Sequence, residues 1–236
     1  MNYQIRAANL RGIFFSAIFA LASFASLANI ANAREPAKPL QRLENCRWIQ
    51  NESNDGDSFH VSWKGKEFIF RIYFVDAPET ENRFPERVQD QAKYFGITPK
   101  QAIEIGKIAA TFTRNKLAKP FTVYTRWTDA RGSSRLERFY AFIVIDDKQL
   151  SDLLVANGLG RIFGMPANLP NGTTATAYIA QLHQLEAKAK ADRLGAWSLQ
   201  GGAALKTENA ASSASSSPAS NWPFSKPAPS PKASSF

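Results

Sequence analysis

The 236-residue sequence has a single cysteine, Cys46, and only two histidines. One cysteine excludes an intrachain disulfide framework, a cysteine-rich zinc module and a CxxC redox site. Two histidines argue against a histidine-rich metal centre. Acidic residues are few: 20 Asp and Glu stand against 29 Lys and Arg, which gives a formal net charge of +9. That excess favours an anionic partner, such as nucleic acid, a phosphate-bearing ligand or an anionic membrane surface.

Long apolar runs are absent apart from one, at residues 13–28. Arg6 and Arg11 precede this run, and a small-x-small pattern follows it at residues 31–33. This is the layout of a secretory signal peptide over residues 1–33, cleaved near Ala33. The alternative is a retained membrane anchor, but the run is shorter than the ~20 residues that a spanning helix needs. We therefore expect an exported monomer, periplasmic or extracellular, without a stable membrane anchor after cleavage.

The other end of the chain is of low complexity. Residues 200–236 are dominated by Ser, Ala and Pro, a composition that cannot bury enough apolar surface to order itself. We expect a disordered tail there. Hydrophobic residues make up 44% of the whole chain, which is enough for a packed core elsewhere. The expected organisation is a lead-in at 34–45 and one folded domain at 46–199.

Within that domain, period-two alternation predicts strands, and 3.6-residue spacing predicts helices. The strands are expected at residues 47–49, 58–63, 68–75, 121–127 and 139–145. The helices are expected at residues 98–117, 150–157 and 175–193, the first with a capping box of Thr98 and Gln101. Three strands with short connections, then a helix and two more strands, predict an α+β fold. Its centre is a five-stranded Greek-key β-barrel of the OB type, with about three helices.

Two aspartates mark neighbouring strand ends in this scheme. Asp57 begins the second strand, and Asp76 follows the third. A meander can bring these ends together, and paired carboxylates are ligands that Ca²⁺ or Mg²⁺ prefers. Pro78 fixes the turn that follows, and Glu79 adds a third carboxylate nearby. The alternative is structural, since Asp-Gly and Asp-Ala-Pro are also ordinary turn sequences.

Arg71 is harder to explain as a structural residue. It lies in the apolar run Ile69–Phe74, within the third expected strand. Burial of an unpaired guanidinium is costly, so this side chain needs an anionic partner or an open cavity. Arg71 therefore belongs with the two aspartates as a candidate site residue.

These segments together resemble one known family. Residues 55–58, 70–71 and 75–80 resemble the thermonuclease (staphylococcal nuclease-like) family, and the resemblance continues through 138–143 and 153–160 to 195–197. It covers nearly the whole expected domain. The resemblance implies an OB-type barrel with three helices and a Ca²⁺-dependent endonuclease that hydrolyses phosphodiester bonds of DNA and/or RNA.

The resemblance also implies a role for each matching residue. The metal ligands would be the carboxylates of Asp57 and Asp76 and the backbone carbonyl of Ala77. Arg71 and Arg138 would bind the phosphate and stabilise the transition state, because a planar guanidinium can pair with two phosphate oxygens at once. The general base would be Glu79, beside the attacking water.

The sequence departs from the family pattern at several places. Ala77 replaces a common threonine, which removes a hydroxyl but keeps the backbone oxygen. Leu136 lies where the best-known member has a base-stacking tyrosine. The segment 81–97 is longer than in compact members, and it interleaves Arg, Lys and aromatic residues. Two interpretations of this segment stay open: a track for a single-stranded nucleic acid, or an ordinary segment packed on the barrel.

Two classes of function remain in competition. The first is the secreted or periplasmic nuclease. The second is a non-catalytic OB-fold module of the cell envelope that binds nucleic acid. A third interpretation, an envelope protein whose tail contacts a surface, does not account for Arg71. Because all of the residues that the family's chemistry needs are present, the sequence favours the enzyme.

Overall fold

The computed structural model describes residues 38–132 and 136–200. The expected signal peptide and nearly all of the Ser/Ala/Pro-rich tail lie outside these residues. No helix within the described part of the chain is long and apolar enough to cross a membrane.

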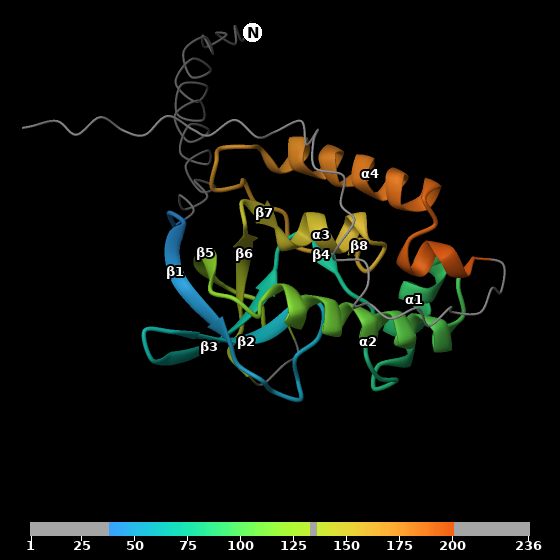
Figure 1. Ribbon diagram of the computed structural model, residues 1–236, viewed down its shortest axis with the longest axis horizontal. Coiled ribbons are helices and arrows are strands. Elements are labelled where there is room, and N and C mark those ends of the chain that lie inside the picture. Colours follow the sequence, from blue (N-terminus) through green and yellow to red (C-terminus); the bar gives the residue numbers. More distant parts are fainter. Residues whose placement is uncertain (1–37, 133–135, 201–236) are drawn as a thin grey trace, which may run out of the picture.

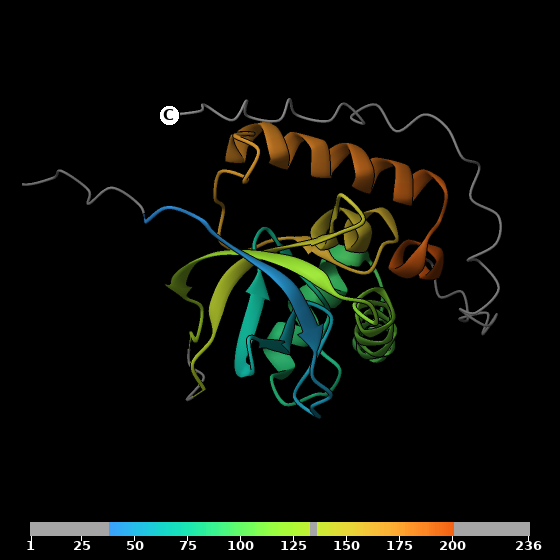
Figure 2. The same ribbon diagram turned by 60° about the vertical axis from the view of Figure 1, so that its left-hand side comes forward.

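A closed β-barrel forms the centre of the molecule (Figures 1 and 2). Its strands are β1 (Gln41–Trp48), β2 (Ser58–Trp63), β3 (Lys66–Ile72), β5 (Phe121–Asp129) and β6 (Phe139–Ile145). They follow the order β3-β2-β1-β5-β6, and β3 closes the barrel by pairing in parallel with β6. The short strand β7 (Lys148–Gln149) extends this sheet beyond β6. The α+β fold with a five-stranded OB-type barrel, expected from the sequence, is confirmed.

The first strand is longer than expected. The sequence pattern predicts a strand from residue 47, whereas β1 begins at Gln41 and ends at Trp48. Its first residues pair with β5, with Leu43 opposite Val123. Both Leu43 and Cys46 are fully buried. Residues 41–45 of the expected lead-in are therefore part of the barrel.

The third strand is shorter than expected. The apolar run predicts a strand through Val75, but β3 ends at Ile72, and Phe74 has a left-handed φ of 67°. This bend turns the chain out of the barrel into the two-residue strand β4 (Val75–Asp76), which pairs with β8 (Arg161–Ile162). The Phe74 ring is buried, with its centroid 4.9 Å from that of Tyr178. Tertiary packing thus stabilises a left-handed conformation at Phe74 that the β-rich sequence does not predict.

The described residues contain four α-helices next to the barrel, one more than expected: α1 (Pro85–Phe95), α2 (Pro99–Lys116), α3 (Leu150–Ala156) and α4 (Ala175–Ala191). A single 3₁₀ turn, η1 (Gly195–Leu199), follows α4. The capping box predicted for α2 is confirmed: the Thr98 side chain accepts from the Gln101 N–H, and the Gln101 side chain accepts from the Thr98 N–H. The unexpected helix is α1, which lies within the segment 81–97.

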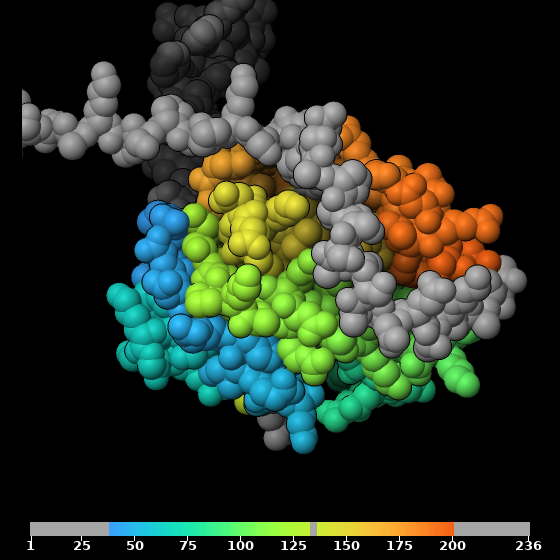
Figure 3. Space-filling model, in the orientation of Figure 1, coloured from blue at the N-terminus to red at the C-terminus, as the bar shows by residue number. Residues whose placement is uncertain are grey.

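The helices cover the barrel on two sides. Helix α2 packs against it through Ile105 and Ala109, whereas Ala102 of the same helix packs against Val88 and Ala92 of α1. Helices α3 and α4 lie side by side above the barrel (Figures 1 and 3). Trp197 of η1 packs on Phe95 at the end of α1, with ring centroids 4.8 Å apart. The arrangement leaves the site-bearing ends of β2 and β4 next to α1 and α2.

Candidate active site

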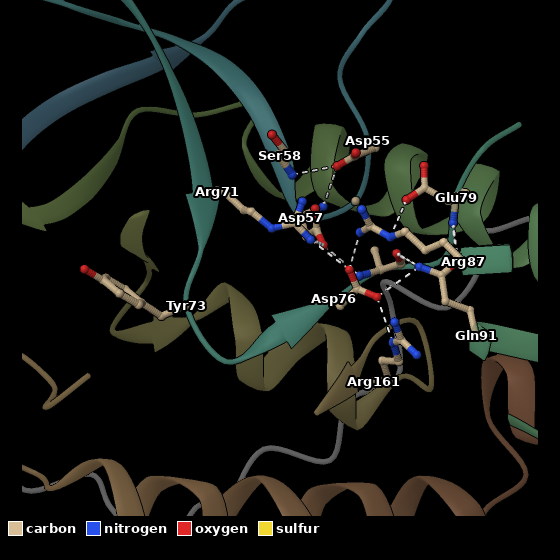
Figure 4. A network of polar contacts seen from close by, with 12 residues as sticks. Asp55, Asp57, Ser58, Arg71, Tyr73, Asp76, Glu79, Arg87, Gln91 and Arg161 are labelled. Atoms are coloured by element: carbon tan, nitrogen blue, oxygen red, sulfur yellow. Dashed lines mark hydrogen bonds and ion pairs between the residues drawn. The ribbon is translucent and has the colours of Figure 1, made fainter. Parts of the chain in front are cut away.

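The two aspartates expected as metal ligands meet at one arginine (Figure 4). A single Arg71 nitrogen, Nη2, lies 3.0 Å from Asp57 Oδ2 and 2.7 Å from Asp76 Oδ1. Both carboxylates are almost completely buried, each 1% exposed. The structure therefore brings together three residues that are expected in the site, and it supplies the anionic partners that Arg71 needs.

A tight turn before β2 fixes the position of Asp57. The Asp55 carboxylate accepts hydrogen bonds from the backbone N–H groups of Asp57 at 2.9 Å and Ser58 at 2.6 Å, which is the local closure typical of Asx turns. Gly56 allows this turn to pack closely against Ala77 and Ala109. A Cβ atom there would approach the Cβ atoms of Ala77 and Ala109 to 2.7 and 2.8 Å. No side chain larger than hydrogen fits at this position without movement of the site.

The turn after β4 carries the other expected residues. The Ala77 N–H donates to Asp57 Oδ2 at 2.9 Å, so the turn is tied directly to the first aspartate. Glu79 follows and is partly exposed, with 20% of its side-chain surface accessible. Helix α2 supports the turn from behind, because Gly106 brings its backbone against the carbonyls of Pro78 and Glu79. Glu79 thus lies at the edge of the cluster with access to solvent.

Helix α1 adds two residues that the sequence analysis did not assign to the site. Gln91 is fully buried; its Nε2 donates to Asp76 Oδ2 at 2.9 Å and to the Ala77 carbonyl at 3.0 Å. Its Oε1 accepts from the Glu79 N–H at 2.9 Å. Arg87, one turn earlier, pairs with Asp76 Oδ1, and its Nε lies 2.9 Å from Glu79 Oε1. The two side chains are four residues apart, so they share one face of the helix.

A third addition comes from β8. Arg161 is 8% exposed, and its Nε donates to Asp76 Oδ2 at 2.8 Å. Its guanidinium also lies 4.4 Å from the centre of the Phe163 ring. The signal was the same as for Arg71, namely an arginine in an apolar stretch, here flanked by Leu159 and Ile162. The pairing of β4 with β8 places Arg161 directly opposite Asp76.

The pKa values of Asp57 and Asp76 are shifted in opposite directions by their surroundings. Burial raises the pKa of Asp57 well above its ordinary value, and the neighbouring Asp55 and Asp76 act in the same direction against Arg71. Burial alone would also raise the pKa of Asp76, but Arg87 and Arg71 outweigh it and hold that pKa below its ordinary value. Asp76 is therefore the firmly ionised member of the pair.

Glu79 has the environment of a proton acceptor. Burial raises its pKa, and the charges of Asp57 and Asp76 add to that effect, whereas Arg87 opposes it. A carboxylate whose pKa is moved towards neutrality is a better general base than an ordinary one. Glu79 combines this property with solvent access.

Arg138 lies immediately before β6, next to the parallel pairing with β3. No hydrogen bond or ion pair joins it to Asp57 or Asp76 within residues 38–132 and 136–200. Its Nε is buried and has no hydrogen-bond partner in that part of the chain. A buried donor without a partner is unusual in a folded protein. Arg138 thus retains a free donor, whereas Arg71 is engaged by the aspartates.

The aromatic residues of the segment 81–97 are mostly turned inward. Phe95 is fully buried, and Tyr94 packs edge-on against it, with ring centroids 5.1 Å apart. The Tyr94 hydroxyl also donates to Glu186 of α4. Only Phe84, at 57% exposure, remains open to solvent. Most of the segment is therefore a helix packed against α2 and β8, and Tyr94 and Phe95 do not form a stacking surface for bases.

The oxygen atoms of the cluster are chemically suited to a hard divalent cation. Carboxylate oxygens of Asp57 and Asp76 converge on one Arg71 nitrogen, and the Ala77 carbonyl shares the Gln91 amide with Asp76. Carboxylate and carbonyl oxygens are the ligands that Ca²⁺ takes in proteins. Within the described residues, no three Asp, Glu, His or Cys side chains are grouped as a metal site. Two carboxylates and one carbonyl would thus leave the remaining coordination positions to water.

An OB-type barrel that carries two buried aspartates and an arginine at one end is typical of the staphylococcal nuclease-like class of proteins. Comparison with known families supports this assignment. The family model described as "Staphylococcal nuclease homologue" matches residues 69–199. This range is more than half of the chain. The protein belongs to the staphylococcal nuclease-like family.

Two curated proteins of Bacillus subtilis (strain 168) are similar to the chain over 148 residues, 62% of its length. Endonuclease YncB is 29% identical, and the match covers 59% of it. SPbeta prophage-derived endonuclease YokF is 27% identical, and the match covers 42% of it. The chain thus spans about half the length of these relatives.

Proposed function

We propose that the protein is a Ca²⁺-dependent endonuclease that hydrolyses phosphodiester bonds of DNA and/or RNA. The observation that carries the proposal is the meeting of Asp57, Asp76 and Arg71 at one point, with Glu79 at its solvent edge. Membership of the nuclease-like family and the endonuclease names of the two relatives support it.

Each residue has a defined part in this proposal. Asp57, Asp76 and the Ala77 carbonyl would hold Ca²⁺, which when bound stabilises negative charge on the phosphate oxygens. Glu79 orients the attacking water and takes its proton, since its carboxylate is exposed and its pKa is raised. Arg71 is held next to the proposed ligands by its two ion pairs, and its other N–H groups would bind the phosphate of the substrate.

Arg138 is the second phosphate-binding arginine of the proposal. Its Nε has no hydrogen-bond partner within the described residues, but it is buried, so the guanidinium has to turn outward to reach a phosphate. Negative charge grows on the non-bridging and leaving oxygens as the phosphodiester is attacked. Two guanidiniums aimed at those oxygens lower the barrier, because they bind the transition state more strongly than the substrate.

An exported location is part of the proposal. It is supported by the composition of residues 1–33 alone, which has the three regions of a signal peptide. The net charge of +9 suits a polyanionic substrate. The protein acts as a monomer in this proposal.

The test is cleavage of single-stranded DNA, duplex DNA and RNA by the purified protein in Ca²⁺ and in excess chelator. We expect cleavage in Ca²⁺ and none in chelator, with an unchanged circular dichroism spectrum. Full activity in chelator would refute the metal assignment. Asp57→Asn together with Glu79→Gln gives the matched inactive control, which excludes a contaminating nuclease.

The alternative, a non-catalytic OB-fold module that binds nucleic acid, is separated by the same assay. It requires tight binding of an oligonucleotide without cleavage under any cation tested. The intact set of Asp57, Arg71, Asp76, Glu79 and Arg138 argues against this alternative. A binding module has no need of a buried carboxylate pair beside a partly exposed Glu79.

A further inference from the structure

Asp76 has no free acceptor position. An ionised carboxylate offers about four lone-pair sites, two on each oxygen. Arg71 and Arg87 donate to Oδ1, and Gln91 and Arg161 donate to Oδ2. Figure 4 shows these donors arriving from different sides of the carboxylate. A cation that coordinates Asp76 therefore has to replace at least one of them.

Three of the four donors are too buried to be released easily from Asp76. Gln91 is fully buried and makes two further hydrogen bonds to the turn after β4. Arg161 has only 10% of its side-chain surface exposed and packs on Phe163. Arg71 has 16% exposed and also pairs with Asp57. Their release would expose unsatisfied buried groups, which is costly.

Arg87 differs in each of these respects. Its side chain is 36% exposed, the most of any donor to Asp76. It projects from α1, so a rotation about its own side-chain bonds moves the guanidinium into solvent while the helix stays in place. Water then replaces the lost hydrogen bonds, and no buried donor is left unpaired.

The charges of the cluster also favour the departure of one arginine when a divalent cation binds. The carboxylates of Asp57, Asp76 and Glu79 are in direct contact with three guanidiniums, those of Arg71, Arg87 and Arg161. These three carboxylates are thus matched one for one by guanidiniums, and Asp55, beside Asp57, is a further carboxylate that interacts with Arg71. A divalent cation that enters this cluster is repelled by all three arginines. The departure of one arginine lowers this electrostatic repulsion.

From this geometry we propose that Arg87 is an internal cation of the reaction centre, which a divalent ion displaces from Asp76. Its second ion pair, with Glu79, is part of the same exchange, since the general base is tied up while Arg87 is in place. Arg87 thereby lowers the affinity of the site for Ca²⁺ and couples cation binding to the release of Glu79. This inference rests on the proposed Ca²⁺ site.

The experiment measures Ca²⁺ affinity directly, by isothermal titration calorimetry on the full chain. We compare the wild type with Arg87→Met, which removes the charge and keeps an unbranched apolar stem. We also test Arg87→Lys, which keeps the charge but lacks the planar fork with which Arg87 reaches Asp76 through Nη2 and Glu79 through Nε. Arg83→Met is the matched control, because Arg83 is 77% exposed and pairs with Glu81.

We expect Arg87→Met to bind Ca²⁺ on the order of 10-fold more tightly than the wild type, Arg87→Lys to lie between them, and Arg83→Met to equal the wild type. The Ca²⁺-induced rise in Tm is expected to follow the same order. Equal or weaker binding by Arg87→Met would overturn the proposal, since it would mean that Arg87 supports the ligands. If that variant does not fold, Arg87→Lys decides, with the same two outcomes.

The nuclease assay on the wild type distinguishes failure of the Arg87 exchange from failure of the proposed nuclease function. Cleavage in Ca²⁺ with unchanged affinity in the Arg87 variants refutes only the role of Arg87. No Ca²⁺ binding and no cleavage by the wild type refutes the proposed function, and the inference with it. Cleavage without any Ca²⁺ binding leaves a nuclease whose chemistry does not use this cation, and it likewise overturns the inference.

Discussion

Gln91 on α1 holds Asp76 from a helix that is inserted between β4 and α2. Its amide N–H group donates to the Asp76 carboxylate at 2.9 Å, while its amide oxygen accepts from the Glu79 backbone at 2.9 Å. One buried side chain thus fixes the distance between an expected metal ligand and the expected general base. Gln91 acts through these two residues, so it is a positioning residue.

Replacement of Gln91 by methionine tests this role. The methionine side chain is similar in length but makes none of the three hydrogen bonds, so the Asp76 carboxylate and the Glu79 N–H lose partners in a buried site. We expect a loss of stability of about 1–3 kcal/mol and a fall in kcat with little change in KM. Thermal denaturation and steady-state kinetics give the two quantities.

Gln89→Met is the matched control for that variant, because Gln89 is exposed on the same helix. It should change neither stability nor kcat. A Gln91→Met variant that is less stable but has the kcat of the wild type would mean that Gln91 supports the fold only.

The arginines are expected to separate into two groups. Arg71→Lys and Arg138→Lys each lose the paired donors that match a phosphate, and we expect a loss in kcat on the order of 10²-fold or more. Arg131→Lys should have almost no effect, since Arg131 is 47% exposed and pairs with Asp129. Single-turnover rates at saturating Ca²⁺ measure the chemical step. A loss at Arg131 as large as at Arg138 would show that the wrong arginine was assigned.

The sequence was sufficient to predict the cluster of Asp57, Arg71 and Asp76. An arginine in an apolar strand and two aspartates at strand ends are local signals, and the family resemblance fixed their relation. The five-stranded OB-type barrel was predicted from the same strands. What the sequence did not reveal is how many arginines Asp76 attracts. Arg161 is 85 residues away along the chain, and Arg87 lies on α1, a helix that the sequence analysis did not predict.

Helix α1 was missed although its signals are present. Pro85 lies at the first helical position, and Gly96 ends the helix with a left-handed φ of 69°. The mixture of charged and aromatic residues concealed the period of Val88, Ala92 and Phe95, which form its buried face. The bend at Phe74 had no local signal at all. It depends on backbone hydrogen bonds with Phe163 and Met165, which only the fold brings there.

Gly106 provides a test of how closely α2 supports the catalytic turn. A Cβ atom at Gly106 would lie 2.2 Å from the Glu79 carbonyl oxygen and 2.5 Å from that of Pro78. Alanine normally stabilises a helix relative to glycine by ~1 kcal/mol. Here we expect the opposite sign, a destabilisation of about 1–3 kcal/mol, because backbone atoms must move.

The same variant should lose activity, since Glu79 moves with its own carbonyl. Lys107→Ala is the control, because Lys107 is an exposed neighbour on α2 that pairs with Glu104. Its effect should stay within about 0.5 kcal/mol. Urea denaturation and initial rates measure both effects. A Gly106→Ala variant more stable than the wild type would mean that α2 does not press on the turn.

Asp152 on α3 should make stability depend on pH, independently of the active site. It is 6% exposed, and burial raises its pKa to about 6. Its Oδ1 accepts from the Tyr178 hydroxyl at 2.6 Å, and Gln181 lies 3.4 Å from its Oδ2. In the unfolded chain an aspartate titrates near pH 3.9. Between about pH 4 and pH 6 the folded state therefore holds a proton that the unfolded state has lost.

Stability contributed by this group is thus complete below about pH 4, falls as the pH rises to about 6, and is then constant. Asp152→Asn removes the titration but keeps an oxygen that accepts from Tyr178. The free energy of unfolding of the wild type, minus that of the variant, should fall by on the order of 2–3 kcal/mol across this window. Urea denaturation of both proteins at intervals from pH 4 to pH 8 measures the difference, and the histidines that titrate in both proteins cancel. A difference that is constant with pH, or that rises, would show that the Asp152 carboxyl is ionised in the folded protein throughout.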